Sequence, residues 1–341
     1  AGQYPTDHRG IYTWAPGSGI ELLASLDAES VSSAGFVLHV EVGYRDIDGN
    51  AVVVIDRGID VEACLPLMAP DEASFLPDGG GGVTPIVAPG MSVPGIEPGW
   101  VFVENAGAAF EFDSFVAGPP RINAHGDLAF IAKIRRSALC GADPAAPYAF
   151  ALFGPDGEGG FTLAAMPLDP APGASEGAVL SPTAVLAINE TGEIVVLVAV
   201  RLGPSGPTVD AIYRWDVAQG LRLVAFANDP ELMGLSSIQG AELGEGGHVV
   251  FTNDWSWTLF LQSESSGVIE IVRPGDPVPG PSQDLLFRQG GSFAVNALGE
   301  GAFSGKAGPE GAGSLDSYGV WERDVLGALE LKLIEGQPAP H

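Results

Sequence analysis

The chain has 341 residues, including 48 glycines and 28 prolines, and its net charge is −28. Hydrophobic residues make up 46% of it, so the charge is not accompanied by the low hydrophobicity that keeps chains unfolded. The charge excludes nonspecific nucleic-acid binding, because phosphate would repel the chain, and no apolar run reaches the roughly 18 residues of a membrane-spanning helix. We therefore expect a folded, turn-rich protein with no nucleic-acid partner and no membrane span.

The first residue and the cysteines bear on location. The sequence starts at Ala1 without a methionine, as an exported protein does after removal of its signal peptide, although a trimmed sequence would start in the same way. We expect an extracellular or cell-surface protein. Cys64 and Cys140 lack the CxxC spacing of a zinc or redox site. One disulfide and two unbonded thiols remain as alternatives.

A short aromatic strand is expected at residues 10–14, and two kinds of segment then recur along the chain. The first kind is Asn-x-x-Gly followed by an apolar strand. Asparagine and glycine both tolerate positive φ, so the pattern predicts a tight turn, and the apolar run after it predicts a buried strand. The clear copies begin at Asn123, Asn189 and Asn296, and degenerate copies lie at residues 32–39 and 244–251.

The second kind of segment is rich in proline and closes each repeat. Its best copy, residues 271–280, contains Gly275-Asp276-Pro277 and ends in Pro279-Gly280. Because proline has no N–H to donate, the segment is expected to end a sheet and to start the connection to the next one. Related segments lie at residues 86–95, 168–173, 224–230 and 334–340, with a faint copy at 22–28.

An aromatic strand lies between the two kinds of segment, and a further strand precedes the Asn-x-x-Gly turn. Each unit therefore predicts about four short antiparallel strands, with a spacing typical of a propeller blade. We expect an all-β fold, a β-propeller of about five to six four-stranded antiparallel blades, in a single domain over residues 1–341. The expected units are 10–30 (partial), 31–95, 96–173, 174–234, 235–280 and 281–341.

This pattern resembles a family of tandem-repeat proteins that bacteria secrete or anchor at their surface. Repeats of that family carry an Asn-x-x-Gly-x-Val-Ala-Phe strand and a Gly-Asp-x-x-Pro-Gly close. The resemblance extends from about residue 10 to the C-terminus. It implies a propeller-like fold and an extracellular location, and it carries little information about activity.

The halves of the repeats do not balance. Five Asn-x-x-Gly halves stand against six closing halves, and the half-blade at residues 10–28 has no obvious partner. A strand from residues 96–110 could complete it within the chain. Alternatively, it leaves an unpaired sheet edge that invites a strand from another chain. Self-association through an unpaired blade edge is therefore one hypothesis.

Asp46, Asp48 and Asn50 resemble the start of a calcium-binding loop. The twelfth position of such a loop would be Arg57 instead of glutamate, and an Asp-Gly hairpin turn explains the same residues. Calcium is the only cofactor that these patterns suggest.

Trp255 and Trp257 would lie on one face of a strand, where two indoles either stack on a carbohydrate or fill the core. No Gly-x-Ser-x-Gly or HExxH pattern marks a catalytic residue. The main hypothesis is a non-catalytic extracellular propeller with a structural, adhesive or assembly role. The alternative is a glycan-binding or glycan-active propeller with its site at the central channel, formed by loops from distant sequence positions.

Overall fold

The structure is a computed structural model. It describes residues 10–15, 19–25, 39–45, 51–56, 72–77, 83–87, 91–104, 120–136, 148–227, 229, 232, 237–253, 257–263, 267–279, 285–309 and 317–335. All regular elements in these ranges are β-strands, and none of the described residues forms a helix that could cross a membrane. The chain divides into two compact units, Ala1–Pro167 and Leu168–His341.

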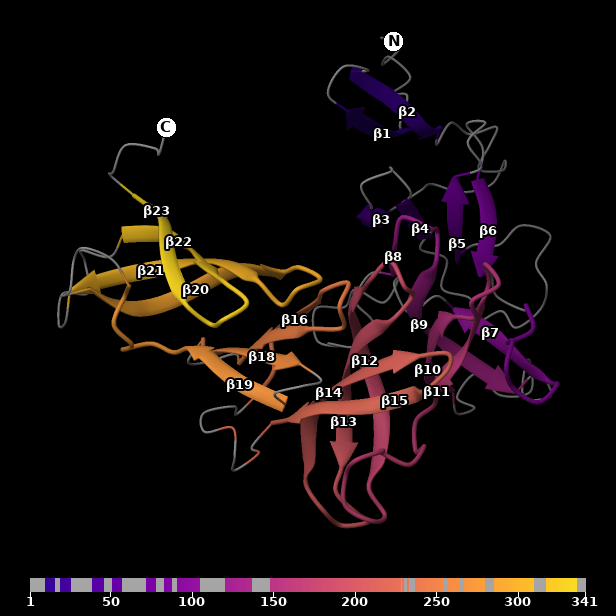
Figure 1. The fold of residues 1–341 in the computed structure, drawn as a ribbon. Helices are drawn as coiled ribbons and strands as arrows, with labels where there is room; N and C mark the ends of the chain where they lie inside the picture. The colour runs from indigo at the N-terminus through magenta and orange to yellow at the C-terminus, as the bar shows by residue number, and fades with distance from the viewer. Residues whose placement is uncertain are drawn as a thin grey trace, which may run out of the picture. The chain divides into compact units, whose positions relative to one another are not determined.

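The first unit contains a hairpin and two larger sheets (Figure 1). The hairpin consists of β1 (Gly10–Ala15) and β2 (Gly19–Ser25). The next sheet pairs its strands in chain order: β3 (His39–Arg45), β4 (Ala51–Asp56), β5 (Glu72–Pro77) and β6 (Val83–Val87). The third contains β7 (Trp100–Glu104), β8 (Arg121–Ile122), β9 (Leu128–Arg136), β10 (Ala149–Pro155) and β11 (Phe161–Ala165). Because β7 and β8 pair with different parts of β9, they share the place of one first strand.

The second unit contains three four-stranded antiparallel sheets, each paired in chain order (Figure 1). The first consists of β12 (Val179–Ile188), β13 (Ile194–Arg201), β14 (Thr208–Asp216) and β15 (Gly220–Phe226). The second consists of β16 (Gly240–Leu243), β17 (Val249–Thr252), β18 (Leu259–Ser263) and β19 (Gly267–Val272). The third consists of β20 (Leu285–Val295), β21 (Gly301–Pro309), β22 (Ser317–Arg323) and β23 (Leu329–Ile334). The all-β propeller class expected from the sequence is confirmed by these blade-like sheets.

The Asn-x-x-Gly segment joins the first and second strands of a sheet. In one buried copy, the Asn189 Oδ1 atom accepts hydrogen bonds from the N–H groups of Thr191 (3.2 Å) and Glu193 (2.9 Å). Gly192 closes the turn at φ +77° by donating its N–H to the Asn189 carbonyl. Positive φ is therefore the role of the glycine alone, whereas the asparagine acts through its side chain. The same contacts recur at Asn123 and Asn296.

Three of the proline-rich segments, at residues 86–95, 168–173 and 271–280, form backbone hydrogen bonds with the first strand of the sheet that follows. After β19, the Gly275 N–H donates to the Phe287 carbonyl, and the Phe287 N–H donates to the Asp276 carbonyl (2.8 and 2.9 Å). Pro277 forms an isolated antiparallel β-bridge with Leu286, at a position where the pairing requires no N–H from the proline. Equivalent bonds join Leu180 to Asp169, and Phe102 to Met91.

Leu168 occupies a backbone position suited to glycine. Its φ is +73°, its side chain is 66% exposed, and it precedes Asp169-Pro170 as Gly275, at φ +95°, precedes Asp276-Pro277. A left-handed conformation costs an L-residue about 1 kcal/mol. We expect Leu168→Gly to raise the unfolding free energy by about 1 kcal/mol and the melting temperature by about 3 °C.

Differential scanning calorimetry measures this change. The reverse substitution, Gly275→Leu, serves as the control and should lower the melting temperature by a similar amount. An unchanged or lower melting temperature in Leu168→Gly would contradict the assignment of strain to Leu168.

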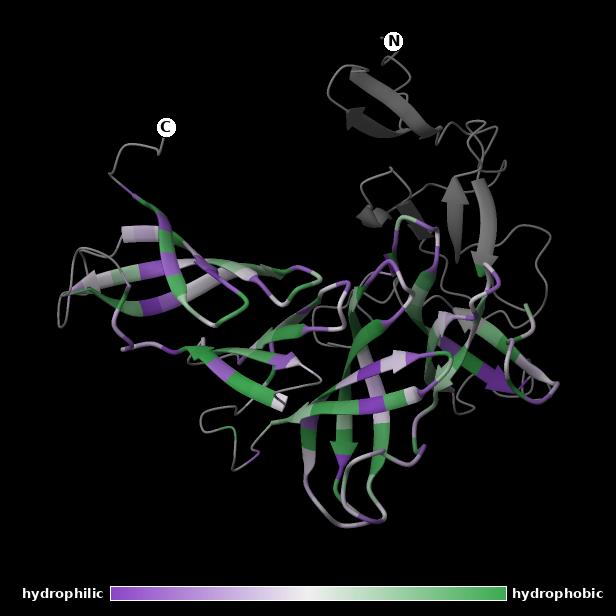
Figure 2. Ribbon diagram, viewed as in Figure 1, coloured by the Kyte–Doolittle hydropathy of each residue, from purple (hydrophilic) through white to green (hydrophobic). Residues whose placement is uncertain are grey.

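Apolar side chains fill the space between neighbouring sheets of the second unit. Val195, Ile212, Phe251 and Phe260 belong to a core shared by sheets β12–β15 and β16–β19. A second core joins sheets β16–β19 and β20–β23, and Figure 2 shows the hydrophobic residues along these strands. All four residues of β17 are buried, whereas burial alternates along most of β21. Among the described residues, sheet β20–β23 therefore has one covered face and one open face.

Candidate functional site

Most residues singled out from the sequence lie outside the described residues. These are Asp46, Asp48, Asn50, Cys64, Cys140 and Trp255. The three calcium-loop residues fall between β3 and β4, whose ends pair through Arg45 and Ala51. This is the connection between a first and a second strand, where other sheets carry the Asn-x-x-Gly turn. Calcium binding and a disulfide stay predictions.

Trp257 lies in the core, which is the packing alternative to carbohydrate stacking. It is 9% exposed, precedes β18, and its ring centroid is 5.7 Å from that of Phe303. Gly290 of β20 accommodates the indole, because a Cβ there would lie 1.2 Å from Trp257 Cε2. The buried ring therefore contributes to the contact between two sheets.

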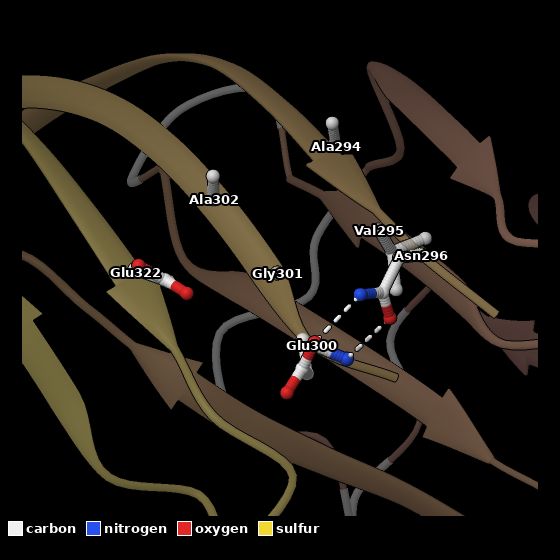
Figure 3. A pocket seen from close by; sticks show the side chains of 7 residues that line it. All are labelled: Ala294, Val295, Asn296, Glu300, Gly301, Ala302 and Glu322. Carbon is white, nitrogen blue, oxygen red and sulfur yellow. Dashed lines mark hydrogen bonds between the residues drawn. The ribbon is translucent and has the colours of Figure 1, made fainter. Parts of the chain in front are cut away.

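A pocket of about 260 Å³ lies on sheet β20–β23, near the turn between β20 and β21 (Figure 3). Ala294, Ala302 and Glu322 are neighbours on three adjacent strands and form one row across the sheet. Their alternation with the buried residues Phe303 and Trp321 places this row on the open face. The lining residues are Ala294, Val295, Asn296, Glu300, Gly301, Ala302 and Glu322.

Two carboxylates and one amide supply the polar atoms of this pocket. Asn296 Nδ2 donates to Glu300 Oε2 at 2.7 Å, and Asn296 Oδ1 accepts from the Glu300 N–H at 3.0 Å. Glu322 forms an ion pair with Lys332 at 2.8 Å, and Lys332 also reaches Glu330 at 2.8 Å. Hydrogen bonds to Glu322 and Glu330 raise the pKa of Lys332 above its usual range. Asn296 and Lys332 thus hold the two pocket carboxylates in place.

The pocket suits a small ligand rich in hydroxyl groups. Ionised carboxylates accept hydrogen bonds from hydroxyls, and the alanine and glycine lining leaves room for a ring to approach. No group of three or more histidine, cysteine, aspartate or glutamate side chains in the described part of the chain could hold a metal ion.

A cluster of charged side chains lies near the Asn-x-x-Gly turn of sheet β12–β15 and has a structural role. Arg214 Nε and Arg222 Nη2 each donate to Glu193 Oε1 at 2.7 Å, and Arg222 also pairs with Asp216 at 2.6 Å. The Glu193 and Arg214 side chains are 9% and 6% exposed. Gly247, in the turn of the next sheet, lies against this pair, since a Cβ there would be 2.5 Å from Arg214 Nη2. The cluster therefore forms part of the contact between sheets.

Comparisons with known proteins extend the description of the fold. Residues 236–340, which contain sheets β16–β19 and β20–β23, match a family of unknown function (DUF7453). No curated protein matches the chain in sequence.

Three solved structures are similar to the chain. Polysaccharide lyase Uly1 has 10% identity and a TM-score of 0.38 over 94% of this chain and 76% of its own. An engineered GH43 glycoside hydrolase has 13% identity and a TM-score of 0.28 over 86% and 51%. A levansucrase mutant from B. megaterium has 9% identity and a TM-score of 0.25 over 99% and 95%.

The pocket has no local sequence signal. The sequence predicts Asn296 as a turn residue, but it gives no reason to connect Glu300 with Glu322. The connection comes from the pairing of β21 with β22, in which Ala302 lies beside Glu322.

Proposed function

We propose that this protein is a non-catalytic, carbohydrate-binding propeller of the cell surface or extracellular matrix. The observation that carries this proposal is the pocket in which Asn296, Glu300 and Glu322 surround a floor of small residues. Such side chains fix the orientation of sugar hydroxyls, and the small residues permit close contact with the ring. Its volume of about 260 Å³ is large enough for a single sugar unit.

The charges of the pocket favour a neutral carbohydrate. Two carboxylates line the pocket, and the chain carries a net charge of −28. A uronic acid or sulfated sugar would therefore be repelled.

The same contacts favour binding over hydrolysis. Glycosidases need one protonated carboxylic acid beside one ionised carboxylate. Glu300 accepts a hydrogen bond from Asn296 and Glu322 is paired with Lys332, so both carboxylates are held by neighbouring side chains, which suits the orientation of sugar hydroxyls.

Replacing Glu322 tests the proposal. We expect Glu322→Gln to weaken the affinity for neutral oligosaccharides of glucose, galactose or mannose at least about tenfold, because a charge-assisted hydrogen bond is lost. Isothermal titration calorimetry measures the dissociation constant of each sugar.

Glu330→Gln is the matched control. Glu330 also binds Lys332 at 2.8 Å, but it does not line the pocket. Its substitution should leave the affinity unchanged. Equal losses in the two variants, or no binding of any neutral sugar by the unmodified protein, would contradict the proposal.

A further inference from the structure

The pocket on sheet β20–β23 lies at one end of a longer strip of the open face. Along β21, Ala302, Ser304 and Lys306 occupy alternate positions, and the residues between them are buried. Successive side chains of a strand point to opposite faces, so these three residues share one face. Ala302 lines the pocket, and the strip therefore continues from the pocket along the strand toward Lys306.

The neighbouring strand β22 extends this strip in parallel. Glu322, Val320 and Tyr318 pair with Ala302, Ser304 and Lys306 in that order, and the β22 residues between them are buried. Glu322 lines the pocket, and Tyr318 lies four residues away on the same strand. At a rise of about 3.3 Å per residue, this spacing places the two residues roughly 13 Å apart along the strand.

Tyr318 presents an aromatic ring at the end of the strip that is far from the pocket. It is 59% exposed, whereas Trp321 on the opposite face of β22 is fully buried. Lys306 Nζ lies 5.2 Å from the centroid of the Tyr318 ring, and the exposure shows that this contact leaves much of the tyrosine accessible. A tyrosine combines an apolar ring with a polar tip, which suits the apolar C–H face and the hydroxyl groups of a sugar.

Small and polar side chains occupy the strip between its two ends. Ser304 Oγ accepts a hydrogen bond from the N–H of Ser292 on β20 at 3.1 Å, so these two serines lie side by side. Gln289 of β20 is exposed and pairs with Lys306, which adds an amide group beside the lysine. Such side chains supply hydrogen-bond donors and acceptors, and the short ones permit an extended ligand to lie close to the sheet.

We propose that this strip binds an extended neutral oligosaccharide, with one sugar unit in the pocket and a later unit of the same chain stacked on Tyr318. The inference rests on the proposed function, because the pocket must first bind a neutral sugar. A distance of roughly 13 Å exceeds the length of one sugar ring, so only a chain of linked units reaches both ends. Glu322 accepts hydrogen bonds at one end and Lys306 donates them at the other, and hydroxyl groups match both.

Isothermal titration calorimetry with sugars of increasing length tests this inference. The probes are glucose, galactose and mannose, and their β-1,4-linked oligomers from the disaccharide to the hexasaccharide. We expect the longest oligomers of a sugar that binds to have at least about tenfold higher affinity than the monosaccharide. Tyr318→Ala should remove most of this gain and leave the affinity for the monosaccharide unchanged. Tyr318→Phe should keep the gain, because stacking requires the ring and not the hydroxyl.

Tyr148→Ala is the matched control. Tyr148 is 47% exposed, and Lys133 Nζ lies 3.9 Å from its ring centroid, but it belongs to the first unit of the chain. Its substitution should leave the affinity for every length unchanged.

The outcomes distinguish a failure of the strip from a failure of the pocket. Equal affinity for the monosaccharide and all oligomers overturns the strip and leaves the pocket as a site for a single unit. A Tyr318→Ala variant that keeps the full gain, or that loses affinity equally for all lengths, also overturns the strip. The same holds if Tyr148→Ala and Tyr318→Ala cause equal losses. A protein that binds no neutral sugar of any length overturns the proposed function as well.

Discussion

Replacing Gly290 with alanine is expected to lower the free energy of unfolding by about 4 kcal/mol. A Cβ at this position would coincide with the indole of Trp257, 1.2 Å from its Cε2 atom. The indole is 9% exposed and packs against Phe303, so it cannot move without losing its core contacts. Urea denaturation followed by tryptophan fluorescence measures the loss.

Two further variants separate the clash from a general effect of alanine. In a Trp257→Ala background the added methyl group meets no ring, so Gly290→Ala should cost little beyond the loss of Trp257 itself. Gly240→Ala in β16 is the matched control, since its Cβ would meet only Phe293 Cζ at 3.9 Å. Its effect should stay within about 0.5 kcal/mol. A Gly290→Ala loss that persists in the Trp257→Ala background would contradict the clash.

Replacing Glu193 with alanine is expected to cost about 3 kcal/mol. Glu193 accepts hydrogen bonds from Arg214 and Arg222, and the Arg214 side chain is 6% exposed. Removing the carboxylate leaves a buried guanidinium without this counter-charge, beneath the turn at Gly247. Chemical denaturation again measures the difference.

An exposed ion pair is the control for Glu193. Glu97 and Arg136 are joined at 2.6 Å, but their side chains are 64% and 59% exposed. Glu97→Ala should therefore change the unfolding free energy by less than about 0.5 kcal/mol. Replacing Glu193 and Arg214 together by leucine and methionine should restore much of the lost stability, because no buried charge then remains at Arg214. Equal losses at Glu193 and Glu97 would contradict a buried, mutually dependent pair.

The strands could be predicted from the sequence because turn chemistry is local. The oxygen of Asn189 reaches N–H groups two and four residues ahead, so a short motif contains the whole interaction. The split first strand was not predicted. β7 and β8 pair with different parts of the same strand, β9. Only this pairing shows that together they take the place of one first strand.

The pocket could not be predicted because its residues are brought together by strand register. Glu300 comes directly after the predicted turn at Asn296. Glu322 comes later in the sequence, after residues 310–316, so no local motif contains both glutamates. Trp257 shows the converse limit. Its spacing from Trp255 allowed stacking on a sugar, and its burial depends on the missing side chain at Gly290, 33 positions later in the chain.

The hydrogen bonds between a proline-rich segment and the following sheet affect how neighbouring sheets unfold. Phe287 belongs to β20, yet its N–H and carbonyl are both bound to residues that follow β19. Opening the segment therefore removes backbone partners from the first strand of the next sheet. Leu180 is bound in the same way to Leu168 and Asp169, and the Phe102 N–H is bound to the Met91 carbonyl. In repeat proteins such terms between neighbours determine how far an unfolding event spreads. Where these bonds occur, a proline-rich segment and the first strand of the sheet that follows it thus belong to one cooperative unit.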